Sequence, residues 1–221
     1  MQQMWTDLDN YIDSHLIPDD PILKQTLENT AAHGFPDHLA VAANQGMLLQ
    51  MLIQMNGCKR VLELGTFAAY STMWLARALP EDGYILTIEG RDTHAAMGQE
   101  NIERANLKQT VELKCGRAAD ILKALPEDTE PFDFIFIDAD KQSYPEYLEL
   151  SLNLSRSGTL IFLDNVIRAG DIINPDNHKP SIEGIREMFK LMQEHPRLLS
   201  STALQTVGSK GHDGFALAIV K

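Results

Sequence analysis

The spacing of apolar residues changes near residue 58. In residues 1–57 apolar positions recur at helical spacing, with proline-containing breaks at 18–21 and 33–36. From residue 60 onward, short apolar runs alternate with stretches of helical spacing. We expect strands at 60–64, 84–89, 110–113, 132–137, 159–163, 200–206 and 214–220. The expected helices between them lie at 71–79, 92–106, 117–125, 144–155 and 181–195.

This alternation predicts an α/β fold. Strands separated by helices form βαβ units in a parallel sheet, and strands that are apolar throughout are buried on both faces of such a sheet. The glycine-rich link at 208–214 predicts that the last two strands form an antiparallel hairpin. We therefore expect one domain over residues 1–221, in which a helical extension over 1–57 packs on a doubly wound α/β core over 58–221.

Met47, Met51 and Met55 lie four residues apart on one face of an expected helix. Methionine most often fills irregular gaps in a hydrophobic core, so this spacing favours a buried face. The alternative is that the three side chains form a soft wall for a partner or a planar substrate.

Charge and composition narrow the classes of function. The 221 residues hold 19 Lys and Arg against 31 Asp and Glu, a net charge of −12. This balance disfavours binding to nucleic acid or to an anionic membrane surface. No apolar run approaches the roughly 18 residues that a membrane span needs, and the first residues lack a secretory signal pattern. With two cysteines, Cys58 and Cys115, we expect a cytoplasmic protein in which both are small buried hydrophobes.

Polar residues at the end of the first expected strand indicate a cofactor site. Glu63 lies at the end of this strand, Gly65 and Thr66 form the following turn, and a helix begins near Ser71. Glu89 ends the second strand, where an acidic side chain can accept hydrogen bonds from a ribose diol. The turn lacks the GxGxxG pattern that cradles a pyrophosphate, so S-adenosylmethionine is favoured over a dinucleotide. The alternative for both carboxylates is a structural role in a cap or turn.

Oxygen ligands follow the fourth and fifth expected strands. Asp138 follows the fourth, and Asp164 and Asn165 follow the fifth. If these strands are neighbours, their ends lie about 4.8 Å apart, and two carboxylates and an amide converge there. An oxygen-only set favours a hard ion such as Mg²⁺, with Ca²⁺ or Mn²⁺ as alternatives. Helix capping by both carboxylates is equally compatible with the spacing. Lys141 is either a solvated side chain or, beside a metal, a base.

Five segments together carry a recognisable pattern. They are 61–71 (VLELGTFAAYS), 132–147 (FDFIFIDADKQSYPEY), 164–166 (DNV), 41–49 (VAANQGMLL) and 207–215 (VGSKGHDGF). The most specific part is the combination of Asp-Ala-Asp-Lys at 138–141 with Asp-Asn at 164–165. With these segments the chain resembles, over nearly its whole length, the cation-dependent small O-methyltransferases, the caffeoyl-CoA and catechol O-methyltransferase-like group, especially its bacterial members.

The resemblance implies a class I methyltransferase fold, a Rossmann-like doubly wound sheet of seven strands with the last one antiparallel. It also implies S-adenosylmethionine as cofactor, a divalent cation and a homodimer. The positions that match cofactor-binding residues of the family are Val41, Glu63, Gly65, Thr66, Ser71, Glu89, Ala118 and Asp138. Asp138, Asp164 and Asn165 match its metal ligands. Lys141 matches the catalytic base, and Asp138 lies close to both cofactor and substrate in that pattern.

Two positions depart from the family pattern. Ala69 stands where the family usually has glycine, and a backbone that needs a positive φ there would weaken cofactor binding. Arg168 stands where many members carry tryptophan, so this side chain faces either an anionic group of the acceptor or solvent. It begins a polar segment, 168–180, with the length of a binding loop or lid, although a solvated surface excursion fits the same pattern.

These features lead us to expect a metal-dependent transfer of a methyl group from S-adenosylmethionine to a hydroxyl of a catechol-like small molecule. The metal would chelate both oxygens of the diol and acidify the attacking hydroxyl, and Lys141 would take its proton. One alternative is methylation of a hydroxylated tRNA base, which the net charge disfavours. Others are a catalytically weak module that binds S-adenosylmethionine, and a nicotinamide oxidoreductase, which the missing GxGxxG disfavours.

Overall fold

The computed structural model describes residues 1–36 and 39–221, and its centre is a seven-stranded sheet with the order β3-β2-β1-β4-β5-β7-β6. Strands β1 to β5 pair in parallel, and β7 pairs antiparallel with both β5 and β6. The strands are β1 (Arg60–Leu64), β2 (Tyr84–Glu89), β3 (Thr110–Cys115), β4 (Phe132–Ile137), β5 (Ser155–Asp164), β6 (Leu198–Gly208) and β7 (Gly211–Val220). This topology confirms the predicted fold, including the antiparallel last strand.

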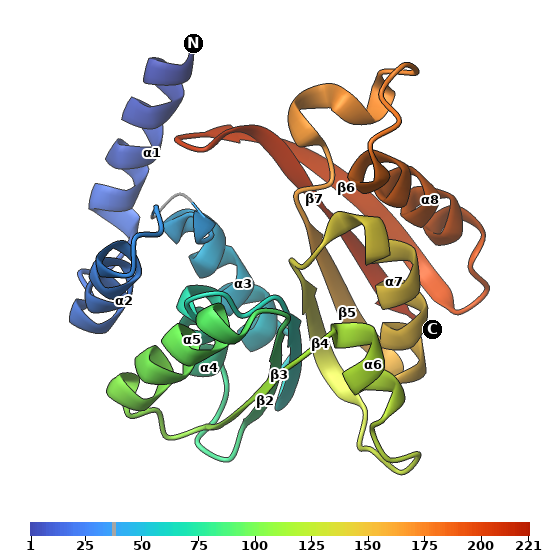
Figure 1. Ribbon diagram of the computed structural model, residues 1–221, viewed down its shortest axis with the longest axis horizontal. Coiled ribbons are helices and arrows are strands. Elements are labelled where there is room, and N and C mark those ends of the chain that lie inside the picture. The colour runs from blue at the N-terminus through green and yellow to red at the C-terminus, as the bar shows by residue number, and fades with distance from the viewer. Residues whose placement is uncertain (37–38) are drawn as a thin grey trace.

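Helices cover both faces of the sheet (Figure 1). The first three form the expected N-terminal extension, and the others alternate with the strands as predicted. The helices are α1 (Gln2–Leu16), α2 (Pro21–Ala32), α3 (Ala43–Met55), α4 (Tyr70–Ala78), α5 (Asp92–Ala105), α6 (Ala118–Lys123), α7 (Tyr144–Asn153) and α8 (Pro180–Glu194), with short 3₁₀ helices η2 (Lys141–Ser143) and η3 (Arg168–Ile173).

The core has a cluster on each face of the sheet. One joins the sheet to α6, α7 and α8, with Leu148 of α7 and Ile185 of α8 fully buried. The other joins it to α3 and α4, through Leu49, Ile53 and Leu75. The near-continuous apolar strands follow from this cover on both sides, because neither face of the central strands meets water.

The pairing of β4 with β5 positions the predicted metal ligands. Ile137 of β4 pairs with Leu163 of β5 in parallel register. Asp138 and Asp164 therefore come directly after a paired position on two neighbouring strands, as the sequence predicts. Paired strands lie about 4.8 Å apart, so the chain places these two acidic residues side by side at the carboxyl edge of the sheet.

The methionine stripe on α3 does not form the buried face of that helix. Met51 and Met55 are 50% and 78% exposed, so the expectation that they fill the core is wrong. The buried face instead carries Gly46 together with Leu49 and Ile53. At Gly46 a Cβ would meet the ring of Trp74 of α4 at 2.5 Å, so the approach of α3 to α4 rotates Met51 and Met55 outward. Met47 alone keeps the expected role, because it is partly buried against the cluster that contains Trp74.

Helix α1 lies beside the tip of the β6–β7 hairpin (Figure 1). Gln2 donates hydrogen bonds to the carbonyls of Gly208 and Ser209 at 3.0 Å, and Asp9 accepts one from the Ser209 amide at 2.6 Å. The N-terminal extension therefore contacts the β6–β7 hairpin through α1, and it contacts α4 and α5 through α2 and α3.

Both cysteines carry free thiols, with Cys58 buried and Cys115 exposed. The expectation of burial is thus wrong for Cys115, whose Sγ donates to Asp92 at 3.0 Å. Within the two described ranges, no helix has the length and apolarity needed to cross a membrane.

Candidate active site

A cavity of about 630 Å³ opens at the carboxyl ends of β1, β2 and β4. This is the edge at which doubly wound sheets bind their ligands. Every predicted cofactor residue except Glu63 lines it: Val41, Gly65, Thr66, Ser71, Glu89, Ala118 and Asp138. The predicted metal ligand Asn165 lines it too. Residues from six separate chain segments thus meet in one hollow large enough for a nucleoside-sized ligand.

The turn after β1 is built from left-handed backbone conformations. Gly65 has φ +103°, and a Cβ there would lie 2.3 Å from the carbonyl oxygen of Asp138. Phe67 and Ala69 also have positive φ, 47° and 61°. Asn101 of α5 donates a hydrogen bond of 2.9 Å to the Ala68 carbonyl and fixes the turn from outside. The glycine-like backbone suspected at Ala69 is therefore present, and an alanine adopts it at a steric cost.

Glu63 lies behind the cavity, beneath the start of α4. Its fully buried carboxylate accepts hydrogen bonds from Ser71 and Thr72 at 2.5 Å and from Thr87 at 2.7 Å. Burial raises the pKa of Glu63 to about 7 in spite of these three donors. Glu63 does not line the cavity itself. It orients the hydroxyl of Ser71, which does.

Glu89 is held at the end of β2 by backbone amides. Its two carboxylate oxygens accept from the N–H groups of Phe67 at 2.8 Å and Arg91 at 3.0 Å, and His94 Nδ1 lies 3.4 Å away. The side chain lines the cavity although it is nearly buried. A carboxylate fixed in this way can accept further hydrogen bonds from hydroxyl groups of a ligand.

An aromatic cluster beside Glu89 was missed by the sequence reasoning. Phe35, Phe67 and His94 meet edge to face, with ring centroids 4.9 to 5.6 Å apart. Phe67 and His94 both line the cavity. The available signal was weak: Phe67 lies inside the glycine turn, and His94 lies in the first turn of the helix after Glu89.

Lys141 and Asp138 form an ion pair at the edge of the cavity. Lys141 Nζ donates to Asp138 Oδ1 at 2.5 Å, and the lysine side chain is only 9% exposed. Burial opposes the charge on the ammonium, but the negative charge of Asp138 outweighs it and raises the pKa of Lys141 above its ordinary value. Lys141 can accept a proton only after this pair is broken.

Tyr144 ties the two strand ends together. Its buried hydroxyl donates to the Asp164 carbonyl at 2.7 Å and lies 3.1 Å from that of Ile137. Its ring centroid is 5.2 Å from Lys141 Nζ, which adds a cation–π contact. One side chain thus holds the end of β4, the end of β5 and the lysine in a fixed arrangement.

Asp164 is buried next to Asp138. Burial and the negative charge of Asp138 raise the pKa of the Asp164 carboxyl above its usual range. Its Oδ1 accepts from the Asn165 amide at 2.8 Å, and Asn165 itself has φ 54°, which turns the chain at this point. Two acidic side chains and an amide therefore share one region, although Asp164 itself does not line the cavity.

This donor set fits a hard divalent cation. It holds only oxygen ligands, and its two carboxylates disfavour each other's charge unless a cation neutralises them. Among the residues that the structure describes, no group of three His, Cys, Asp or Glu side chains is placed to hold a metal. A cation bound here would therefore depend on an amide oxygen as well as on the two carboxylates.

Comparison with known proteins identifies the family of this chain. The O-methyltransferase family matches residues 13–218. A catechol O-methyltransferase of Niastella koreensis is 46% identical over 220 residues, which cover 99% of each chain. A catechol O-methyltransferase of Mycobacterium tuberculosis is 41% identical, covering 97% of this chain and 96% of its own. The O-methyltransferase of Bacillus cereus, solved in complex with SAH, is 48% identical, with a TM-score of 0.96 and full coverage of both chains.

The matches extend over nearly the whole chain, and the predicted family and fold are both confirmed by them. The chain therefore belongs to the O-methyltransferase family and is an O-methyltransferase.

Proposed function

We propose that this enzyme transfers a methyl group from S-adenosylmethionine to a hydroxyl of a vicinal dihydroxy aromatic small molecule, with the help of a divalent cation. One observation carries the proposal. Asp138 and Asn165 line the same cavity as the glycine turn and Glu89, so oxygen ligands for a cation adjoin the expected adenosyl site.

The methyl donor is assigned to this cavity at the carboxyl ends of β1, β2 and β4. The fixed Glu89 carboxylate offers acceptors for a ribose diol, and Phe67 and His94 offer an apolar wall for a flat ring. The related enzyme of Bacillus cereus was solved with SAH, the product of this donor. The sulfonium activates its own methyl group, so the protein mainly positions the two reactants and excludes water.

The residues assigned to the cation are Asp138, Asp164 and Asn165. A bound Mg²⁺, Ca²⁺ or Mn²⁺ would supply Lewis acidity that lowers the pKa of a coordinated hydroxyl. Tyr144 holds the strand ends that carry these ligands. Lys141 adjoins them, and we assign it to take the proton of the attacking hydroxyl once its pair with Asp138 is broken.

The acceptor class follows the names of the relatives and the charge of the chain. The Niastella koreensis and Mycobacterium tuberculosis relatives are named catechol O-methyltransferases. A net charge of −12 disfavours an RNA acceptor, so we place a small aromatic diol ahead of a tRNA base.

We also propose a cytoplasmic homodimer. No residue of α1 is buried, and the helix exposes several large apolar side chains, which a second copy would cover. These side chains are Met4, Leu8, Tyr11, Ile12 and Leu16. Light scattering on purified protein checks the dimer, with a mass of twice 24.7 kDa as the expected result.

A product assay tests the proposed function. Purified enzyme is incubated with S-adenosylmethionine and a panel of catechols, with Mg²⁺ or with EDTA, and methylated products are detected by mass spectrometry. We expect product with Mg²⁺, strong loss with EDTA, and loss with Asp138→Ala. Full activity in EDTA that Asp138→Ala leaves unchanged would remove the cation from the account, and no methylated catechol under any condition would remove the acceptor class.

A further inference from the structure

A second cavity, of about 350 Å³, lies beside the first. Its walls come from η2, from the start of α8 and from the segment after β5, and its lining residues are Ala139, Asp140, Lys141, Gln142, Arg168 and Ser181. Ala139 and Asp140 line both cavities. A ligand whose reacting end reaches Asp138 and Asn165 in the first cavity can therefore extend a substituent into the second.

The segment that brings Arg168 to this cavity is strained and firmly held. Asn165, Arg168 and Ala169 all have left-handed φ angles, between 53° and 54°, within five residues. Non-glycine residues adopt this conformation at a cost, and such strain gathers at ligand-binding sites. On one side Asp213 of β7 accepts hydrogen bonds from the amides of Ile167 at 3.0 Å and Arg168 at 2.9 Å.

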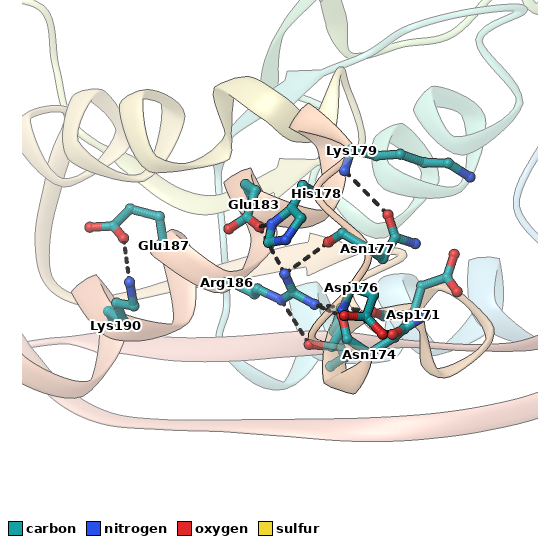
Figure 2. Close-up of polar contacts among 11 residues, drawn as sticks. Asp171, Asn174, Asp176, Asn177, His178, Lys179, Glu183, Arg186, Glu187 and Lys190 are labelled. Atoms are coloured by element: carbon teal, nitrogen blue, oxygen red, sulfur yellow. Dashed lines mark hydrogen bonds and ion pairs between the residues drawn. The ribbon is translucent and has the colours of Figure 1, made fainter.

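On the other side the segment is anchored by Arg186 of α8 (Figure 2). Its guanidinium donates to the Ile172 and Asn177 carbonyls at 2.9 Å, and also to the Asn174 carbonyl and the Glu183 carboxylate. This helix also packs closely on the opposite wall, because a Cβ at Gly184 would lie 2.3 Å from the Lys141 carbonyl oxygen. Helix α8 therefore fixes both walls of the second cavity. The segment 168–180, predicted as a binding loop, is therefore held in a fixed conformation and forms a preorganised wall of the cavity.

Arg168 is the positively charged side chain of this cavity whose hydrogen-bond donors are open to a ligand. Lys141, the other one, is engaged with Asp138 at 2.5 Å. The Arg168 guanidinium forms a long ion pair with Asp213 Oδ2, 3.9 Å away, which is beyond hydrogen-bond distance and leaves its N–H donors open. Within the described part of the chain, the Arg168 side chain donates no hydrogen bond, and it is 44% exposed. A planar guanidinium with open donors matches the two oxygens of a carboxylate.

We propose that the second cavity receives an anionic substituent of the acceptor, so that Arg168 selects aromatic diols that carry a carboxylate on the ring or on a short side chain. This inference rests on the proposed function, because it extends the diol acceptor from the first cavity into the second. The carboxylate of Asp140 lies on the shared wall, and it accepts from the Tyr147 hydroxyl at 2.5 Å. That negative charge favours placing the anion at the Arg168 end of the cavity.

The experiment compares a charged and an uncharged acceptor that differ only in the carboxylate and its methyl ester. The wild type is assayed with 3,4-dihydroxybenzoate and with its methyl ester, and kcat/KM is measured for each. The variants are Arg168→Gln, which keeps a polar side chain but removes the charge, and Arg168→Lys, which keeps the charge. Arg156→Gln serves as a matched control at the start of β5, where the exposed Arg156 pairs with Asp133 at 2.5 Å. Melting curves confirm that each variant is folded.

We expect the wild type to prefer the acid by about tenfold or more, the size of one charge-assisted hydrogen bond. Arg168→Gln should lower kcat/KM for the acid by a similar factor and leave the ester within about twofold, while Arg168→Lys should keep part of the preference. An ester used as well as the acid by the wild type, or an equal loss for both substrates in Arg168→Gln, would overturn the inference while the proposed function stands. No product from either substrate would instead count against the proposed function.

Discussion

Lys141 donates a 2.5 Å hydrogen bond to the carboxylate of Asp138, so the residue assigned as base is paired with a residue assigned to the cation. The two assignments depend on each other. While Asp138 neutralises the ammonium, Lys141 remains protonated and holds no free electron pair. A cation that takes over Asp138 would leave the lysine without its counter-charge, in a setting where burial alone lowers its pKa.

The first prediction concerns Lys141. Replacement by Met should lower kcat about 100-fold or more, because the attacking hydroxyl loses its proton acceptor. The affinity for S-adenosylmethionine, measured by calorimetry, should change by less than about threefold, since Lys141 lines the second cavity and not the one assigned to the methyl donor. Lys141→Arg serves as the charge control, because arginine does not deprotonate in proteins, and it should be as slow as Lys141→Met. A kcat within a factor of about two for both variants contradicts a proton-transfer role.

The second prediction concerns Asp164. In the wild type, Mg²⁺ should raise the melting temperature, because a ligand that binds only the native state stabilises it. Asp164→Asn removes one of the two carboxylates and should weaken Mg²⁺ binding about tenfold or more. Asp176→Asn, at an exposed position in the segment after β5, provides a matched change of charge and should leave binding unaltered. Equal stabilisation of all three proteins by Mg²⁺ would place the cation elsewhere.

The third prediction concerns the strained turn after β1. Ala69 has φ 61°, a conformation that glycine adopts without the steric penalty of a Cβ. Ala69→Gly should raise the free energy of unfolding by about 1 kcal/mol and tighten S-adenosylmethionine binding. The neighbouring Ala68 does not have a positive φ, so Ala68→Gly should instead destabilise the protein. Denaturant unfolding and calorimetry measure both effects, and a less stable Ala69→Gly protein would show that the Ala69 methyl group contributes more by packing than it costs by strain.

The fourth prediction is a pH dependence of stability from Glu63. Its pKa is about 7 in the folded protein against an ordinary value of 4.5, so the native state binds the proton more tightly. The free energy of unfolding should therefore fall as the pH rises from about 4.5 through about 7, by at most about 3 kcal/mol. Glu63→Gln carries no titrating group and should lose this part of the pH dependence.

Unfolding in denaturant at pH 5 and pH 8 measures the effect. Glu187→Gln on α8 gives the control, because Glu187 is solvent-exposed and pairs with the exposed Lys190 at 3.0 Å. Its pH profile should match the wild type. The account of Glu63 fails if Glu63→Gln keeps the full decline in stability between the two pH values.

The fold was predictable from sequence because its strands are covered on both faces. The apolar runs at 60–64, 84–89 and 132–137 match β1, β2 and β4 residue for residue. Strand β5 begins at Ser155, earlier than expected, since its polar first residues pair irregularly with β4. The buried face of α3 was predicted wrongly, because periodicity identifies a row of similar residues on a helix but does not determine which row packs on the core. The contact between Gly46 and Trp74 decides that.

The site was predictable in its location and incomplete in its contacts. The rule that ligands bind at the carboxyl ends of parallel strands placed Gly65, Glu89 and Asp138 on one cavity. The burial of Glu63 behind Ser71 and the pairing of Lys141 with Asp138 depend on side-chain directions, which strand ends alone do not fix. Arg186 gave no signal in the sequence, because it holds the segment after β5 through backbone carbonyls, and these are present in any sequence.

The most direct test of the central claim is anomalous diffraction from crystals grown with Mn²⁺ and S-adenosylhomocysteine. The account predicts one strong manganese peak within bonding distance of oxygens of Asp138, Asp164 and Asn165, next to the bound nucleoside. Anomalous density elsewhere with none at these three residues, or a nucleoside bound away from Glu89, would contradict it.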